Sequence, residues 1–412
     1  MTIETTAERE LDALRTSIAN DLTDYLDDLE HLVNIDCGSY TPDGVNEVGR
    51  WVATFLSEMG ADIEVRPDPE GRFGHTVVAT FRGTLHGPRV LLIGHMDTVF
   101  DPGTVAERPF RIDAGIATGP GVTDMKSGLL AGLYALKALI AEFDGLPFER
   151  LVFIANPDEE VGSPSSSAHI RQLAADVDAC LVLECARANG DIVSARKGIL
   201  DTRLAVHGRA AHAGVEPEKG RSAIAEAARL VRDLHALNGR WPGVTVNVGV
   251  IRGGTRPNVV AERCDLEVDV RSVTAEGLAA AEAAIREIAA ATEVPDTTVD
   301  AHVTVAWQPM EKLARSGRLV EHARAVAARL GFEVQDASTG GASDANTTSG
   351  MGVPSLDGLG PIGGNDHAPA EYLVVDSIVP RTTLLAGLLI AIARDPEVLA
   401  WRTDDPRFDA GA

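Results

Sequence analysis

The sequence has few cysteines and no segment typical of export or membrane insertion. Its four cysteines form no C-x-x-C pair, which argues against a zinc site built from thiolates and favours small core residues. The N-terminus has neither the basic nor the apolar stretch of a signal peptide. The longest apolar run near the C-terminus, residues 384–393, is shorter than the roughly 20 residues that span a bilayer. We therefore expect a soluble cytoplasmic protein that does not enter a membrane.

Positive charge is scarce as well. The 37 lysines and arginines are outnumbered by 61 aspartates and glutamates, which gives a net charge of -24, and no basic run interrupts this excess. We therefore expect no binding to nucleic acid or to an anionic membrane surface. Apolar residues make up 45% of the chain, as in ordinary globular proteins, and 412 residues suffice for two or three domains with a large core.

The most informative stretch is V-L-L-I-G-H-M-D-T-V-F at residues 90–100. A short apolar run that ends in glycine predicts a buried strand of a parallel sheet, and open α/β sheets bind their ligands where such strands end. In an extended H-x-D sequence the two side chains lie on the same side of the strand. Asp97 can then hold the second ring nitrogen of His95. We interpret His95 as a metal ligand and Asp97 as the residue that orients it.

Strands and helices alternate along the first part of the chain and again near its end. Two more apolar runs, residues 151–155 and 179–183, are also followed by acidic residues. This alternation predicts an α/β domain with a mostly parallel sheet. The expected helices are 11–33, 45–56, one that ends near 143, 315–330 and 377–394, and the expected strands are 63–66, 76–81, 90–93, 151–155, 179–183, 332–335 and 355–356.

The pattern changes from about Lys197, where the chain takes the order β-α-β-β-α-β that is typical of a ferredoxin-like fold. We predict an inserted α+β domain over 198–308, and a catalytic domain made of 1–197 and 309–412. The elements expected in the insert are strand 201–207, helix 221–237, strands 244–251 and 264–271, helix 275–290 and strand 298–305.

Acidic and histidine side chains follow the buried strands or stand in glycine-rich loops. Such a set of groups would repel one another unless cations neutralise them, and oxygen ligands with two imidazoles suit zinc, with cobalt or manganese as alternatives. If the pair at 159–160 is extended, its side chains face opposite ways, so that one can bind metal while the other takes a proton from water. The candidates are His95, Asp124, Glu159, Glu160, Glu184 and His367.

Four motifs together resemble the zinc-dependent aminoacylase, dipeptidase and glutamate carboxypeptidase family, in particular its glutamate carboxypeptidase-like branch. They are G-H-M-D-T-V at 94–99, G-P-G-V-T-D-M-K-S-G at 119–128, D-E-E-V-G at 158–162 and D-H-A-P-A-E at 366–371. The resemblance covers nearly the whole chain, including the order of the insert. It implies a phosphorylase/hydrolase-like catalytic domain with a ferredoxin-like lid and dimerisation domain.

The resemblance also implies roles for the candidate residues. It implies two zinc ions per chain that share Asp124, and the peptide after this residue is often cis in the family. His95 would pair with Glu184 on one ion, and Glu160 with His367 on the other. Glu159 would be the general base and would later pass its proton to the leaving amine.

Further roles fall in the insert and in the loop that follows it. In a homodimer formed through the insert, His212 of G-R-A-A-H-A-G would reach the partner's active site and stabilise the oxyanion, a contribution of about 3–4 kcal/mol per donor. Asn258 and Arg271 resemble residues that bind the substrate carboxylate, for which arginine is suited. The loop that contains Gly341 would line the acid side of the substrate.

The family resemblance leaves the substrate open between several small molecules. It implies cleavage of an amide next to a free carboxylate, in a small peptide or an N-acyl amino acid. Relatives that take C-terminal glutamate carry an arginine where Trp307 stands here, so the preference for glutamate is open and an aromatic or apolar group gains weight. The alternatives are a deacylase of an acetylated or succinylated biosynthetic amino acid, and an inactive binding protein, which the presence of Glu159 and all five ligands disfavours.

Overall fold

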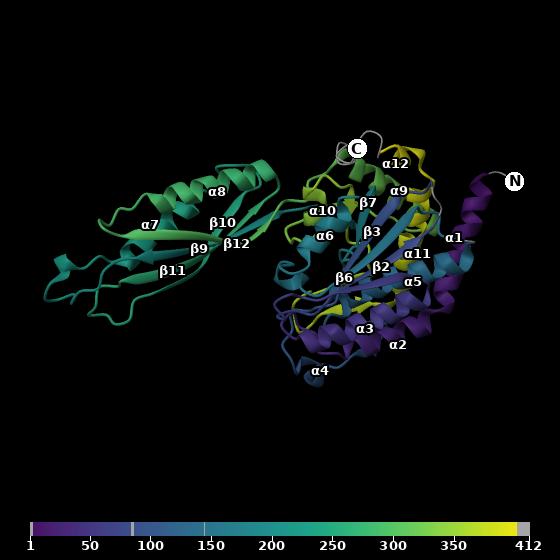
Figure 1. Ribbon diagram of the computed structural model, residues 1–412, viewed down its shortest axis with the longest axis horizontal. Helices are drawn as coiled ribbons and strands as arrows, with labels where there is room; N and C mark the ends of the chain where they lie inside the picture. The colour runs from purple at the N-terminus through teal and green to yellow at the C-terminus, as the bar shows by residue number, and fades with distance from the viewer. Residues whose placement is uncertain (1–2, 84–85, 144, 402–412) are drawn as a thin grey trace. The chain divides into compact units, whose positions relative to one another are not determined.

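The computed structural model describes residues 3–83, 86–143 and 145–401, which fall into two compact units (Figure 1). Unit 1 comprises Met1–Ser194, Lys312–Ser338 and Ser343–Ala412, and unit 2 comprises Ala195–Glu311 and Thr339–Ala342. The insert predicted over 198–308 falls inside unit 2. Residues 402–412 of the predicted catalytic domain lie outside the described residues.

Unit 1 is built on a six-stranded sheet in the order β1-β2-β6-β3-β7-β14. The pairs β6–β3, β3–β7 and β7–β14 are parallel, whereas β1 and β2 run antiparallel at one edge. The predicted α/β class with a mostly parallel sheet is therefore confirmed. The strands are β1 Asp62–Arg66, β2 Thr76–Arg82, β3 Arg89–His95, β6 Arg150–Asn156, β7 Ala179–Val182 and β14 Ser355–Leu356.

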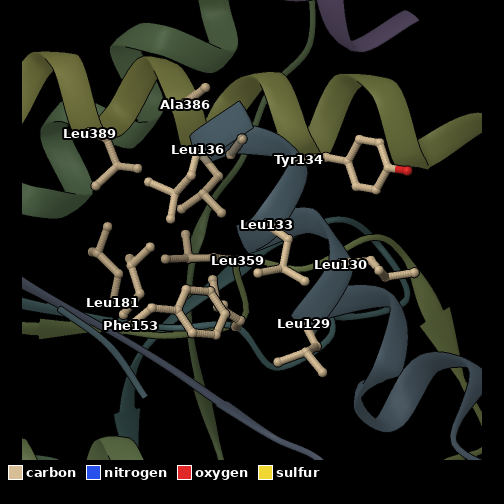
Figure 2. Packing of buried hydrophobic residues seen from close by; sticks show 14 of the residues in the cluster. Leu129, Leu130, Leu133, Tyr134, Leu136, Phe153, Leu181, Leu359, Ala386 and Leu389 are labelled. Carbon is tan, nitrogen blue, oxygen red and sulfur yellow. The ribbon is translucent and has the colours of Figure 1, made fainter. Parts of the chain in front are cut away.

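The hydrophobic core of unit 1 lies between this sheet and the helices that cover it. In Figure 2, Leu133 of α5 (Ser127–Glu142) lies near Phe153 of β6, while Leu389 of α11 (Ile378–Arg394) approaches from the other side of the cluster. Each fully buried side chain of this size contributes roughly 1.5–3 kcal/mol. The segment Val375–Arg394 is long and apolar enough to cross a membrane by length and composition, and 72% of it is buried against other parts of the protein. It packs on α1, α5 and α9, as a core helix does.

Among the predicted helices and strands of unit 1, two differ from the structure. The helix predicted over 11–33 is two helices, because the chain leaves helical geometry at Asp21, whose carboxylate pairs with Lys137 at 2.9 Å. The strand predicted over 332–335 is wrong: strand β13 (Asp336–Thr339) begins only afterwards and pairs with β8 (Ile192–Arg196). The other helices of the unit are α1 Ile3–Asn20, α2 Leu22–Val33, α3 Pro42–Glu58, α4 Thr104–Glu107, α6 Ser167–Ala174, α9 Ala314–Leu330, α10 Asp344–Gly350 and α12 Pro396–Ala400, with short turns η1 Val122–Lys126, η2 Glu159–Val161 and η4 Val375–Ser377.

A small second sheet in unit 1 brings two distant loops together. Its order is β15-β16-β5-β4, and β16 pairs antiparallel with β5. The loop 365–371 lies between β15 and β16, and the loop 119–124 follows β5, so this pairing places both loops at one end of the small sheet. The strands are β4 Arg111–Asp113, β5 Ile116–Thr118, β15 Gly363–Gly364 and β16 Tyr372–Val374.

Unit 2 is an antiparallel sheet with the strand order β10-β11-β9-β12, in which the first and third strands along the chain lie at the centre. This is the ferredoxin-like arrangement that the sequence predicts. Figure 1 shows both of its helices on one face of the sheet, where they bury a separate hydrophobic core. The elements are β9 Gly198–His207, η3 Pro217–Lys219, α7 Ala223–His235, β10 Thr245–Gly253, β11 Arg263–Ser272, α8 Ala275–Ala290 and β12 Thr298–Trp307.

Candidate metal centre

The parallel strands of unit 1 end at one edge of the sheet and carry acidic and histidine side chains there. His95 is the last residue of β3, and Glu184 follows the neighbouring strand β7. Glu159 and Glu160 follow β6, on the other side of β3. The helix α5 comes very close to this edge, because a Cβ on Gly128 would lie only 1.8 Å from a backbone oxygen of β7's extension. Only glycine fits at that position.

The first triad consists of His95, Asp124 and Glu184. Nε2 of His95 lies 3.1 Å from Oδ1 of Asp124 and 3.7 Å from Oε1 of Glu184. One ligand atom from each residue lies within 4.8 Å of the other two. The side chain of His95 is 1% exposed, and that of Glu184 is 11% exposed.

The second triad consists of Asp124, Glu160 and His367. Nε2 of His367 lies 3.1 Å from Oδ2 of Asp124 and 3.0 Å from Oε2 of Glu160. These three ligand atoms also lie within 4.8 Å of one another. Asp124 therefore belongs to both triads and turns a different carboxylate oxygen toward each. The peptide bond between Asp124 and Met125 is cis.

The pKa values in the triads reflect a dense cluster of acids. Burial alone would lower the pKa of His95, but its hydrogen bonds to Asp124 and Asp97 outweigh burial and raise that pKa well above its usual range. Hydrogen bonds to Asp124 and Glu160 raise the pKa of His367 to about 11. Burial, followed by the charge of Asp124, raises the pKa of Glu160 to about 7. The surrounding carboxylates thus favour the charged form of both imidazoles.

The side chains of the triads fit divalent cations. Each triad offers imidazole nitrogen and carboxylate oxygen, the ligand types that zinc and related metals take. Oε1 of Glu160 is buried and has no hydrogen-bond partner among the described residues, although an unpaired buried carboxylate oxygen is costly. A cation would satisfy this oxygen and replace the protons on the imidazoles.

Asp97 makes more contacts than the sequence predicts. Nδ1 of His95 lies 3.0 Å from the backbone oxygen of Asp97 and 3.3 Å from its carboxylate, which is consistent with an orienting role. The same carboxylate accepts hydrogen bonds from Ser39 Oγ at 2.7 Å and from the backbone nitrogens of Glu159 and Glu160 at 3.1 and 3.2 Å. Asp97 therefore holds β3's end and the acidic pair after β6 together.

The acidic pair forms a turn, whereas the interpretation of the sequence supposes that it is extended. Glu159 and Glu160 begin the 3-10 turn η2, whose first backbone N–H groups donate to Asp97. Their side chains nevertheless have different surroundings. The carboxylate of Glu160 contacts His367. Glu159 is buried, with 8% of its surface exposed. Burial, with the charge of Glu184 adding to it, raises the pKa of Glu159 well above its usual range, and His95 acts in the opposite direction.

Glu371 is a site residue to which the sequence analysis assigns no role, although it ends one of the four motifs. It is 1% exposed, and its carboxylate accepts hydrogen bonds from three backbone nitrogens of the loop that carries Asp124. The distances are 2.9 Å to Gly121, 2.8 Å to Thr123 and 3.0 Å to Asp124. Burial raises the pKa of Glu371 to about 7, against the effect of these three N–H groups.

Asp344 is a second such residue. It is 1% exposed, and it accepts hydrogen bonds from Asn156 Nδ2 and Ser163 Oγ, both at 2.7 Å. These two partners stand on either side of the turn that carries Glu159. Burial raises the pKa of Asp344 to about 7. The only sequence signal was its place at the end of the loop that contains Gly341.

The four remaining candidate residues lie in unit 2. His212 forms a bridge with Val259, and the backbone nitrogen of Ala213 donates to the oxygen of Asn258 at 3.0 Å, so these two segments are neighbours. Elsewhere in the unit, Arg271 of β11 pairs with Asp269 at 2.7 Å, the backbone oxygen of Gly341 accepts from Arg196 at 3.1 Å, and Trp307 is buried at the end of β12.

Comparison with known proteins shows relatives along most of the chain. Residues 91–391 match the sequence pattern of peptidase family M20/M25/M40. Carboxypeptidase G2 of Pseudomonas sp. (strain RS-16) is 31% identical over 369 residues, which cover 88% of this chain and 87% of that protein. Succinyl-diaminopimelate desuccinylase of Dechloromonas aromatica is 28% identical over 375 residues, which cover 86% of this chain and 95% of that protein.

The fold is also shared with solved structures. The aminopeptidase PepT of Bacillus cereus superposes with a TM-score of 0.76 at 24% sequence identity, over 90% of this chain and 99% of that one. At this level of identity the similarity concerns the architecture of the two units.

Proposed function

Because this chain belongs to peptidase family M20/M25/M40, we propose that it hydrolyses an amide bond next to a free carboxylate with the help of two zinc ions. The family and fold inferred from the four motifs are confirmed, and with them a metal-dependent hydrolase. The observation that carries the proposal is that Asp124 belongs to both triads and turns one carboxylate oxygen toward each.

The substrate we propose is a small peptide that loses its C-terminal amino acid, or an N-acyl amino acid. The similarity to a protein named carboxypeptidase G2 supports this class. Deacylation of a succinylated or acetylated biosynthetic amino acid is the second candidate, and the similarity to a desuccinylase over 86% of this chain supports it. Both reactions break an amide bond and place the same demands on the centre.

In the proposed mechanism the side chains of unit 1 hold the cations and move one proton. His95 and Glu184 would hold one ion, Glu160 and His367 the other, and Asp124 both. When bound, the ions would polarise the substrate carbonyl and make the attacking water more acidic. A carboxylate oxygen of Glu159 would take the proton of that water and later deliver it to the leaving nitrogen.

Unit 2 would supply substrate contacts and the interface with a second subunit. In this proposal Asn258 and Arg271 bind the substrate carboxylate, the loop at Gly341 lines the acid side, and His212 stabilises the oxyanion in the partner's site. The strand β10 lies at the edge of its sheet, and an edge strand can pair with a second copy of the chain. We also propose a cytoplasmic homodimer with the insert as its interface.

The experiment measures metal content and turnover on the wild type and on Glu159→Gln. We expect two divalent ions per chain in both proteins, and a fall in turnover of about 100- to 10,000-fold in the variant, the usual contribution of a general base. Unchanged turnover would remove Glu159 from this role. A panel of dipeptides, N-acyl amino acids and succinylated or acetylated diamino acids then separates the two substrate classes.

A further inference from the structure

We propose that Glu371 is a positioning residue that fixes Asp124, and thereby sets the affinity of the second triad for its cation. This inference rests on the proposed function, because it assigns a task within the same metal centre. Glu371 meets Asp124 at its backbone nitrogen and not at the carboxylate that would bind metal. Its carboxylate contacts only the backbone of the loop 119–124 among the hydrogen bonds that the structure records for it.

The loop that carries Asp124 is built around an anion. Oε1 of Glu371 accepts from both Thr123 and Asp124, and Oε2 accepts from Gly121. Gly121 has φ +71°, a left-handed conformation that glycine adopts without strain, and its N–H donates to the carboxylate. Three N–H groups that converge in this way form a site for a negative charge. Without the carboxylate, these three N–H groups would lack their partner, and the loop would lose three of its hydrogen bonds.

The loop that carries Glu371 also carries His367. It is short and self-bonded: Asn365 Nδ2 donates to the oxygen of Ala370, and the nitrogen of Glu371 donates to the oxygen of Ala368, both at 3.0 Å. It is enclosed by β15 and β16, and β16 pairs with β5 directly before the loop of Asp124. Glu371 therefore links the backbone of Asp124 to the loop that carries His367, and both of these residues belong to the second triad.

The second triad depends on this link more than the first does. His95 is anchored within the six-stranded sheet, and Glu184 directly follows its strand β7. His367 stands on a loop with a left-handed backbone (φ +62°), and its side chain is 56% exposed. A shift of Asp124 would change its 3.1 Å approaches to both His95 and His367, but only the first triad would keep two other ligands that are held by strand ends.

The test is a zinc titration of Glu371→Gln with calorimetry and a competing chelator. Glutamine keeps the size and one acceptor oxygen, but its NH2 group would point a second donor at a backbone N–H. We expect the first zinc to bind as in the wild type and the second about 10- to 100-fold more weakly, the usual cost of losing a group that orients a ligand. Circular dichroism of the metal-free protein verifies that the variant is folded.

Two further variants keep the outcome decisive. Glu226→Gln is the matched control, since Glu226 is also fully buried and accepts hydrogen bonds from two backbone nitrogens, at 3.0 and 2.8 Å, but lies in unit 2. We expect it to lower the melting temperature without changing either zinc affinity. Glu371→Asp keeps the charge on a shorter side chain and decides the question if the glutamine variant does not fold.

The results separate the two levels of the proposal. Wild-type affinity for both zinc ions in a folded Glu371 variant would overturn the positioning role and leave the proposed function intact. Equal weakening by Glu226→Gln would show that general destabilisation, and not position, changes the affinity, and would also overturn it. A wild-type protein that binds fewer than two ions would instead contradict the proposed function itself.

Discussion

The two triads of unit 1 differ in what holds their side chains in place. In the first triad, His95 and Glu184 stand at the ends of paired parallel strands, and their side chains are 1% and 11% exposed. In the second, Glu160 stands on a 3-10 turn and His367 on a loop, and the His367 side chain is 56% exposed. The sheet fixes the first triad, whereas two buried carboxylates, Asp97 and Glu371, fix the segments of the second through backbone hydrogen bonds.

This difference implies that the two cations of the proposed centre would not be held equally well. Strand ends in a buried sheet are rigid, whereas turns and loops are held only by their local contacts. Substitutions in and around the triads would show where the triads depend on one another and where they do not.

Asp124→Asn should have the largest effect, because it is the residue that both triads use. Oδ1 lies 3.1 Å from His95 and Oδ2 lies 3.1 Å from His367, so an amide would offer only one good ligand oxygen. We expect at most one ion per chain and a loss of turnover of about 1000-fold or more. Metal analysis and steady-state kinetics measure both. Asp113→Asn, exposed on β4, is the control and should match the wild type.

His212→Ala tests whether catalysis depends on a side chain outside the triads. The alanine removes the imidazole that we assign to the oxyanion, so we expect turnover to fall by about 100- to 1000-fold. Metal content should stay at the wild-type value, because His212 belongs to unit 2 and to neither triad. Kinetics and metal analysis on the same preparation test this. Unchanged turnover would refute the role in the oxyanion.

Asp97→Asn should affect both triads, in contrast to Glu371→Gln. Asparagine keeps the backbone oxygen that meets His95 but loses one of the two carboxylate oxygens that accept from Glu159 and Glu160. We expect both zinc affinities to fall, within the range of about 10- to 100-fold. The zinc titration used for Glu371 measures this. If only one affinity changes, Asp97 does not serve both triads.

Asp395→Asn should have the smallest effect and should leave the triads unchanged. Burial would raise the pKa of Asp395, but hydrogen bonds from Arg318 and His322, at 2.7 Å each, lower it to about 2. A lowered pKa stabilises the fold above the ordinary carboxyl pKa, and this contribution disappears as pH falls toward 2. At pH 7 we expect the variant to lose about 1–3 kcal/mol of unfolding free energy.

The pH dependence makes the Asp395 prediction specific. In denaturant titrations, the difference in unfolding free energy between wild type and Asp395→Asn should be constant near neutral pH and shrink as pH falls from about 5 to 2. A difference that does not change with pH would show that Asp395 acts through shape and not through its charge.

The sequence predicts the sheet of unit 1 because its central strands are buried on both faces and appear as unbroken apolar runs. Residues 90–93 are all buried in the structure, within β3. The apolar pattern does not reveal the break at Asp21, because both helices keep one apolar face. Leu14 before the break and Leu29 after it are both fully buried. Periodicity reports the buried face but not the continuity of the helix.

The candidate site can be predicted from the sequence about as far as the fold can. The residues that end apolar strands can be found because position and chemistry coincide, as at His95. Glu371 and Asp344 have no such signal, because each acts on backbone or side-chain groups 181 to 250 residues distant in sequence. The turn at Glu159 is also invisible in the sequence, since its backbone is held by Asp97, which stands 62 residues earlier beyond the end of the neighbouring strand β3.

A crystal structure of the zinc-loaded protein with anomalous diffraction at the zinc edge tests the central claim most directly. The account predicts two peaks per chain, about 3.5–4 Å apart, with one carboxylate oxygen of Asp124 on each. His95 and Glu184 should complete the coordination of one ion, and Glu160 and His367 that of the other. A single peak, or two peaks that do not share Asp124, would contradict it.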